Sequence, residues 1–318
     1  MSTFNTHNAM NKVKILLMAA IVAMAASCGT TRTVPITGRK QTLLVNDEQV
    51  LSLSNQEYTN YMKSAKKSTN STNTAMVQRV GKKLATAVET YLNNNGLSSE
   101  VSNFSWEFNL VQDNSANAFC MPGGKIVVYE GILPYTQNEA SLAIVLGHEI
   151  AHAVAKHSAE QMSKELRNQY GTQILGTVLN AAGVGSTTTQ LAQVIAQKGL
   201  QFRSLKYSRD NETEADKMGL IFAAMAGYDP NVAVTFWQRM SQANGSSSST
   251  SDLFSDHPSD AKRISAIKEE LPEALKYYKP TTTSTTKKTT TTKKTTSSST
   301  KKKTTTTTKK TTSSTKKK

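Results

Sequence analysis

Leu146-Gly147-His148-Glu149-Ile150-Ala151-His152 is the segment that decides the fold of this chain. Positions i and i+4 lie on one face of an α-helix, so His148 and His152 can bind one metal ion while Glu149 reaches a water molecule on it. Apolar residues recur on either side of these three, as in a buried helix. The pattern therefore predicts a zinc-peptidase site on a helix, with metal-assisted hydrolysis as its chemistry.

The sequence around this helix predicts an α+β fold. Thr136-Gln137-Asn138-Glu139 resembles a capping box that opens the helix. Helix-compatible patterns cover 51–67 and 75–93, and short strands are expected at 106–111 and 125–129, the second after a Pro-Gly-Gly turn. We expect a mainly α-helical, gluzincin-like catalytic domain in which a small β-sheet flanks the active-site helix.

Two moderately apolar stretches, 171–185 and 189–200, follow the central helix. Neither is long enough to span a bilayer, and a helical hairpin is the expected form. Such a hairpin would be a lid over the cleft, a membrane-surface element, or a plain pair of core helices; the sequence slightly favours the last.

The N-terminus has the pattern of an export signal. Lys12 and Lys14 precede a twelve-residue apolar stretch at 15–26, which is too short to span a bilayer and has the length of a signal-peptide core. The following Ala25-Ala26-Ser27-Cys28 resembles a bacterial lipobox, in which Cys28 would be lipidated. The alternative is ordinary cleavage after Ala26 or Ser27, with Cys28 incidental. We expect an exported protein, lipid-anchored to a membrane of the bacterial cell envelope and facing the periplasm.

The expected organisation is a lipoprotein signal peptide at 1–27, an N-terminal linker at 28–45, a catalytic domain at 46–279 and a disordered tail at 280–318. After Pro280 the tail contains only Thr, Ser and Lys. It holds twelve lysines of a chain whose net charge is +15, so only +3 belongs to the rest. Nucleic-acid binding is therefore not expected. The tail would contact anionic lipids or envelope polymers, or be a solvated spacer.

Cys120 is the one thiol left if Cys28 is lipidated, so no intramolecular disulfide is expected. No basic partner stands near it in the sequence, which favours a buried small hydrophobe over a nucleophile or a metal ligand.

A catalytic zinc usually takes three protein ligands and keeps one position open. His157 lies one place away from where a metzincin would have its third histidine, so that class is rejected. His157 is expected at the surface near the helix end, with contact to a metal ligand as the lesser alternative. Farther on, Glu212 and Asp216 again lie at i and i+4 on one helical face. One of them can bind metal while the other steadies a ligand.

At this point the chain resembles the zinc metallopeptidase family of the CAAX prenyl protease, HtpX and BepA type, over most of residues 46–270. The resemblance implies that His148, His152 and Glu212 bind one Zn²⁺ and that Glu149 is the catalytic base. It also implies that Asp216 orients a ligand histidine and that Glu214 lies on the other face of its helix.

Two further stretches match the soluble envelope members of that family. One resembles an element whose edge pairs with extended substrate, which suits unfolded polypeptide; its candidate substrate-binding residues are Asn117, Phe119, Gly124, Lys125 and Val127. The other is a late His-Pro motif at His257, with Arg263 beyond it as a further candidate substrate-binding residue. His257 would be a displaceable zinc ligand or an oxyanion helper, a role for which Tyr207 and Arg263 are the alternatives.

We expect a zinc-dependent endopeptidase of the cell envelope that hydrolyses unfolded or misfolded proteins. The competing hypothesis is a chaperone-like binding lipoprotein with a structural or latent metal site. The intact Glu149 disfavours it, because a purely structural site needs no base beside its ligands. An envelope adhesin acting through the basic tail is a third possibility.

Overall fold

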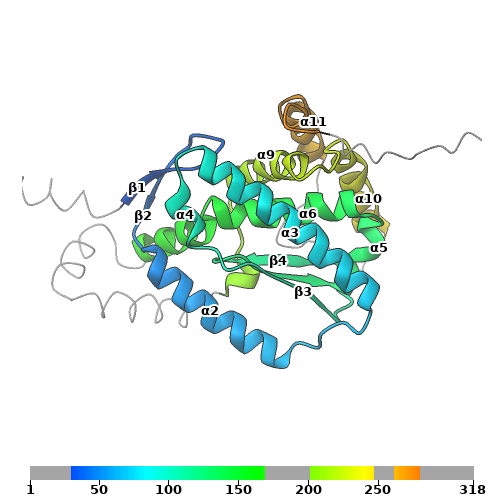
Figure 1. Ribbon diagram of the computed structural model, residues 1–318, viewed down its shortest axis with the longest axis horizontal. Coiled ribbons are helices and arrows are strands. Elements are labelled where there is room, and N and C mark those ends of the chain that lie inside the picture. Colours follow the sequence, from blue (N-terminus) through cyan, green and yellow to red (C-terminus); the bar gives the residue numbers. More distant parts are fainter. Residues whose placement is uncertain (1–29, 169–200, 247–260, 280–318) are drawn as a thin grey trace, which may run out of the picture. The chain divides into compact units, whose positions relative to one another are not determined.

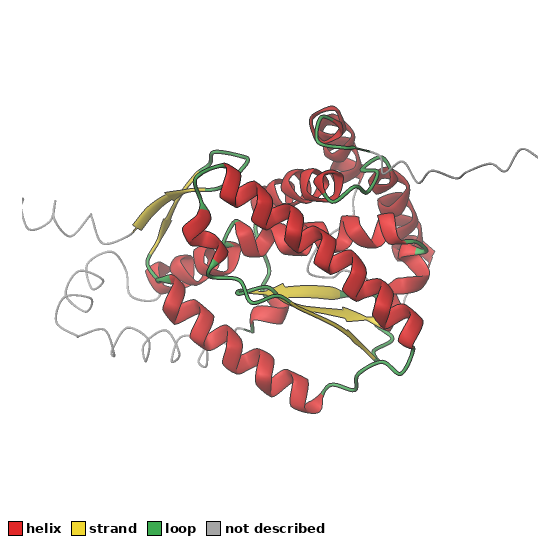
Figure 2. Ribbon diagram, in the orientation of Figure 1, coloured by secondary structure: helices red, strands yellow, loops and turns green. Residues whose placement is uncertain are grey.

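The computed structural model describes residues 30–168, 201–246 and 261–279 (Figure 1). In chain order its elements are β1 (Thr30–Thr33), β2 (Lys40–Leu43), α2 (Asp47–Ser64), α3 (Ser71–Asn94), α4 (Ser98–Val101), β3 (Glu107–Val111), β4 (Ala118–Met121), β5 (Lys125–Tyr129), η1 (Glu130–Ile132), α5 (Leu133–Thr136), α6 (Glu139–Val154), a helical stretch at 157–168, η2 (Phe202–Ser204), α9 (Arg209–Met225), α10 (Val232–Ser246) and α11 (Ala261–Leu275). Helices dominate and the sheets are small (Figure 2), so the expected α+β class is confirmed.

The main sheet has three strands in the order β3-β5-β4. β3 runs parallel to β5, with Glu107 opposite Lys125, and β4 runs antiparallel to β5, with Ala118 opposite Val128. The turn between β4 and β5 contains Gly123 and Gly124, which both have positive φ, a conformation that glycine adopts without steric cost. In this sheet β5 is the central strand and β4 is an edge strand.

The two faces of this sheet belong to two hydrophobic clusters, because side chains alternate along a strand. Ile126 and Val128 of β5 lie in the cluster that contains α3 and α6, whereas Val127 lies in the cluster that contains α2 and the 157–168 stretch. The sheet is thus enclosed between helices, with α2 on the side away from α3 and α6 (Figure 1).

Helix α6 is buried along nearly its whole length, which explains why its sequence is apolar apart from the functional residues. Its N-cap differs from the expectation. Asn138 accepts a hydrogen bond from the Ser141 backbone, whereas Thr136 is the last residue of α5. The helix is therefore capped two residues later than expected, at the Ser141 amide and not at the Glu139 amide.

Helices α6 and α9 approach each other closely at two glycines. A Cβ atom on Gly219 would lie 2.7 Å from the backbone nitrogen of His148, and one on Gly147 would lie 2.7 Å from the carbonyl oxygen of Gly219. The absence of side chains at these positions lets α9 lie directly against the ligand-bearing turn of α6.

Residues 28–45, expected to be a linker, contain a β-hairpin instead. β1 and β2 pair antiparallel, with Thr33 opposite Lys40. Val34, next to β1, is buried in the main core cluster. The hairpin is thereby anchored to the main core.

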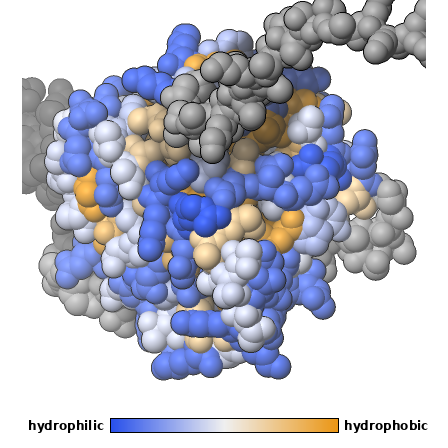
Figure 3. Space-filling view, turned by 45° about the vertical axis from the view of Figure 1, so that its right-hand side comes forward, coloured by the Kyte–Doolittle hydropathy of each residue, from blue (hydrophilic) through white to orange (hydrophobic). Residues whose placement is uncertain are grey.

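The described surface is largely hydrophilic, with small hydrophobic patches between polar residues on the face in Figure 3. Among the described large hydrophobic side chains, Leu275 is the one that is exposed. In those same parts of the chain, no helix combines the length and the hydropathy that a bilayer crossing requires. The expected hairpin at 171–200, Cys28, His257 and the tail lie outside the described residues.

Candidate active site

Helix α6 presents His148, Glu149 and His152 in its buried C-terminal half. The two histidines lie one helical turn apart, so their Nε2 atoms come within 3.0 Å of each other. Glu149, one residue along the helix from His148, is 3% exposed. A buried carboxylate beside two imidazoles is what the sequence motif predicts.

Glu212 of α9 completes a group of three potential metal ligands. Its Oε2 atom lies 3.4 Å from His148 Nε2, and its Oε1 atom lies 3.4 Å from His152 Nε2. A tetrahedral zinc site with ligand bonds near 2.0–2.1 Å has ligand-to-ligand separations of about 3.3 Å. These separations, each measured to a different oxygen of Glu212, are close to that value, and one donor atom from each of the three residues lies within 4.8 Å of the other two. The residues therefore suit a zinc ion, and the described parts of the chain hold no other such group.

Asp216, one turn after Glu212, contacts the far side of the His148 ring. Its Oδ1 lies 2.9 Å from His148 Nδ1. Arg263 of α11 donates two hydrogen bonds of 2.7 Å to the same carboxylate, and its guanidinium lies 3.6 Å above the Trp237 ring. The sequence placed Arg263 at the substrate or the oxyanion; the structure places it against Asp216.

Burial would raise the pKa of Asp216, but Arg263 and His148 outweigh it and lower the pKa. For His148, burial and Arg263 act to lower the pKa, whereas Asp216 and Glu212 raise it to about 9. The carboxylates thus favour positive charge at this position, which a bound cation also supplies.

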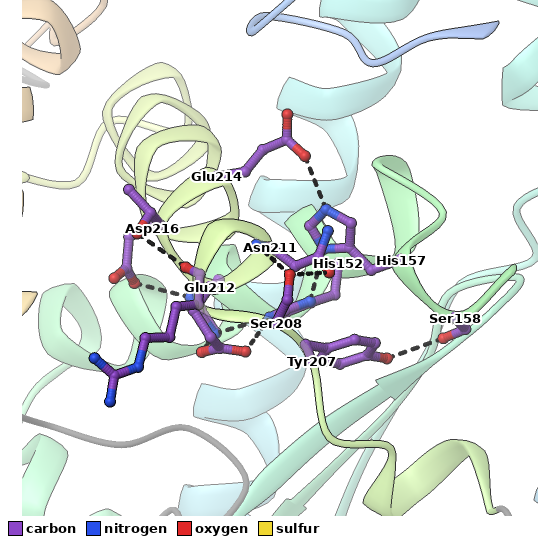
Figure 4. A network of polar contacts seen from close by, with 12 residues as sticks. His152, His157, Ser158, Tyr207, Ser208, Asn211, Glu212, Glu214 and Asp216 are labelled. Carbon is purple, nitrogen blue, oxygen red and sulfur yellow. Dashed lines mark hydrogen bonds and ion pairs between the residues drawn. The ribbon is translucent and has the colours of Figure 1, made fainter. Parts of the chain in front are cut away.

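His157 is not at the surface, contrary to the sequence-based expectation. It is fully buried, with Nδ1 2.8 Å from His152 Nδ1 and Nε2 2.9 Å from a carboxylate oxygen of Glu214 (Figure 4). Burial lowers the pKa of His157 more than Glu214 raises it, so the ring is neutral at pH 7. His157 therefore bridges a candidate metal ligand and a buried carboxylate.

A break in the helix explains this placement. In a continuous helix, residue 157 would lie about 140° around the axis from residue 152, on a different face. Instead α6 ends at Val154, and Lys156 adopts the left-handed conformation with φ 56° before a new helix begins. The turn directs the His157 ring back toward His152. Its amino-acid sequence holds no Gly or Asn that would have signalled it.

Glu214 joins this cluster to the N-terminal hairpin. The Arg39 guanidinium donates to the Glu214 carboxylate at 2.8 Å, and the Thr37 hydroxyl donates to its other oxygen. Arg39 also donates to Glu160 at 2.9 Å. Burial would raise the pKa of Glu214, but His157, Arg39 and Thr37 lower it to about 2. Sequence reasoning missed Thr37, Arg39 and Glu160, because nothing in their local pattern points to the distant histidines.

A small cavity adjoins Glu149 on the side of β4. Its lining includes Asn117, Phe119 and Cys120 from the strand region, with Tyr207 and neighbouring residues on the opposite side. Tyr207 stacks on His152 with ring centroids 4.2 Å apart, and its hydroxyl lies 2.9 Å from that of Ser158 (Figure 4). Cys120 is buried, as expected, and burial raises the pKa of its thiol.

The candidate substrate-binding residues fall into two groups. Asn117 and Phe119 line the cavity beside Glu149. Gly124, Lys125 and Val127 lie elsewhere: Gly124 is in the turn against Trp106, Val127 is buried on the central strand, and the Lys125 ammonium donates to Glu107 at 2.8 Å. Among the described residues, β4 is the edge strand of the sheet that borders this cavity.

Comparison with known proteins agrees with this geometry. A profile described as peptidase family M48 matches residues 71–271. The chain is 42% identical over 176 residues to the mitochondrial metalloendopeptidase OMA1 of Schizosaccharomyces pombe, covering 55% of this chain and 50% of that protein. It is 32% identical over 245 residues to the mitochondrial metalloendopeptidase OMA1 of Homo sapiens, and the match covers 76% of this chain and 46% of that protein.

The chain is also similar to a bacterial protein, the beta-barrel assembly-enhancing protease of Escherichia coli O157:H7. The two are 30% identical over 166 residues, which cover 50% of this chain and 33% of that protein. The chain spans half the length or less of these curated relatives.

Proposed function

The chain belongs to peptidase family M48, and from this premise we propose that it is a zinc-dependent endopeptidase of the bacterial cell envelope. Its substrates would be unfolded or misfolded envelope proteins. One observation carries the proposal: three buried residues whose donor atoms lie within 4.8 Å of one another, two histidines and a glutamate, stand beside the buried carboxylate of Glu149.

Each residue has a defined part in the reaction. His148, His152 and Glu212 would hold the zinc ion. When bound, zinc polarises a substrate carbonyl and lowers the pKa of water to about 7. Glu149 accepts a proton from the attacking water and transfers it to the nitrogen of the leaving amine. Asp216 keeps the His148 ring in the orientation that directs Nε2 to the metal.

The edge of β4 supports a polypeptide substrate. An extended peptide can add to a free sheet edge through backbone hydrogen bonds, which require little sequence preference. The cavity between β4 and Tyr207 also has Glu149 in its lining, so a peptide paired with β4 would pass the base. Asn117 and Phe119 are the predicted contacts there.

The cellular location is inferred from residues 12–28 and from the relatives. We retain lipidation at Cys28 and anchoring to a membrane on the periplasmic side. The beta-barrel assembly-enhancing proteases support an envelope role by their name, whereas the OMA1 proteins are named as mitochondrial. The lysine-rich tail would contact anionic lipids or polymers outside the catalytic domain.

The decisive experiment measures zinc content and casein cleavage on residues 29–318 of wild type, Glu149→Gln and Glu48→Gln. Glu48 is an exposed carboxylate of α2 and controls for the change in charge. We expect about one zinc per chain in all three proteins. Cleavage by Glu149→Gln should fall about 10²- to 10⁴-fold, because the general base is lost, while Glu48→Gln keeps wild-type activity.

Other results separate the alternatives. If Glu149→Gln cleaves casein at the wild-type rate, the assignment of the base is wrong. If all three proteins bind zinc and none cleaves casein, the protein is a binding protein with a structural metal, or its site is latent. If wild type binds no zinc, the metal assignment itself fails.

A further inference from the structure

Each ligand histidine must present a deprotonated Nε2 to the metal, so its Nδ1 must carry the proton and needs an acceptor. For His148 that acceptor is the Asp216 carboxylate, 2.9 Å from Nδ1. This is the common arrangement for metal-bound imidazoles. The equivalent atom of His152 lies 2.8 Å from a ring nitrogen of His157.

A neutral imidazole has one donor nitrogen and one acceptor nitrogen. The Nε2 atom of His157 lies 2.9 Å from Glu214, a carboxylate that can only accept, so Nε2 carries the proton. Nδ1 of His157 is then the acceptor, and it faces His152 Nδ1. The proton on His152 is thereby placed on Nδ1, and the unprotonated Nε2 can bind a cation.

We propose that His157 and Glu214 are positioning residues that set the tautomer and orientation of the metal ligand His152. The proposal rests on the metal site of the proposed function. It assigns a role to the N-terminal hairpin as well, because Arg39 and Thr37 of the hairpin hold the Glu214 carboxylate in place. The hairpin is thus connected to the metal site through three consecutive hydrogen bonds.

The opposite arrangement of protons does not serve metal binding. If His157 donated from Nδ1, His152 would accept at Nδ1 and carry its proton on Nε2. That proton would point at Glu212 and His148, into the space that the cation needs. The Glu214 carboxylate disfavours this arrangement, because it would face the unprotonated Nε2 of His157.

The test measures zinc affinity of the full chain by competition with a chromophoric chelator. His157→Phe fills the space but provides no acceptor, and zinc affinity should fall about 10- to 100-fold. His157→Gln offers an amide oxygen to His152 and an amide N–H to Glu214, and should restore most of the affinity. Tyr58→Phe removes a buried hydroxyl that bonds Glu107 and Asn109 between α2 and β3, and should bind zinc like wild type.

Nitrogen-15 NMR of the imidazole rings provides a readout that needs no variant. In the zinc-loaded wild type, His152 should show a protonated Nδ1 and a metal-bound Nε2, and His157 a protonated Nε2. A His152 ring bound through Nδ1, or a His157→Phe affinity within about twofold of Tyr58→Phe, would overturn the proposal. If wild type itself bound no zinc, the proposed function would fail instead, so the two failures are distinguishable.

Discussion

The two ligand histidines of α6 are supported in different ways. His148 has a carboxylate directly at its Nδ1, and that carboxylate is held by a buried arginine stacked on Trp237. His152 has a second imidazole at its Nδ1, and the carboxylate is one group farther away. We refer to the first support as the aspartate arm (Asp216, Arg263) and to the second as the hairpin arm (His157, Glu214, Arg39, Thr37).

The difference lies in burial and in distance along the chain. The aspartate arm is buried throughout and begins four residues after the ligand Glu212. The hairpin arm ends at Arg39, whose side chain is 31% exposed. Equivalent ligands can therefore depend on interactions of unequal strength, because a charge pair shielded from water responds more strongly to the loss of one member than a pair with one partly exposed member does.

Deleting the arginine of each arm should reveal this inequality most strongly. Arg263→Met leaves Asp216 buried without its guanidinium and should lower the free energy of unfolding by about 3–5 kcal/mol. Arg39→Met leaves Glu214 with His157 and Thr37, and should cost about 1–2 kcal/mol. Urea unfolding of the metal-free proteins measures both. Equal losses would show that the two arms do not differ as described.

The gain in the free energy of unfolding that zinc provides should be smaller in a variant in which either arm is broken. At a free zinc concentration of about 100 Kd, the free energy of unfolding of wild type should rise by about 2.7 kcal/mol. At the same concentration, a variant whose affinity is tenfold weaker should gain about 1.4 kcal/mol. Asp216→Asn and His157→Phe are the variants to compare by thermal or urea unfolding, with and without a chelator. If zinc raises the free energy of unfolding of either variant as much as that of wild type, the corresponding arm does not support the metal site.

The contact between α6 and α9 offers a smaller test, because both arms depend on it. Gly219→Ala places a Cβ atom against the His148 backbone and should destabilise the fold by about 1–3 kcal/mol. Helix propensity alone would make alanine stabilising by about 1 kcal/mol, so the sign of the change decides between the two effects. Thr213→Ala, on the exposed face of α9, is the control and should be close to neutral. A stabilised Gly219→Ala protein would show that the close approach is not needed.

The central part of the site was predictable because its spacing lies within single helices. His148, Glu149 and His152 share one helix, and Glu212 and Asp216 share another, so the i and i+4 rule places each set on one face. The strand at 125–129 was also located correctly. Helices α2 and α3 begin earlier than expected, because Asn46 and Asn70 cap them ahead of the apolar pattern.

The hairpin arm was not predictable from local patterns. His157 was expected at the surface because it does not fit the metzincin spacing and stands near the helix end, and the left-handed Lys156 that redirects it has no sequence signature. Arg39 lies 175 residues from Glu214 in the chain. This ion pair forms because the chain fold brings the hairpin next to α9. The sequence neighbours of Arg39 and Glu214 do not indicate it.

The N-terminal hairpin also bears on how this catalytic unit can be transplanted. The family profile begins at residue 71, whereas the hairpin ends at Leu43. A graft of the profile region into another scaffold would carry the aspartate arm intact and leave Glu214 without Arg39 and Thr37. Modular exchange among such enzymes would therefore have to start near residue 30, or the host protein would have to supply a cation of its own beside Glu214.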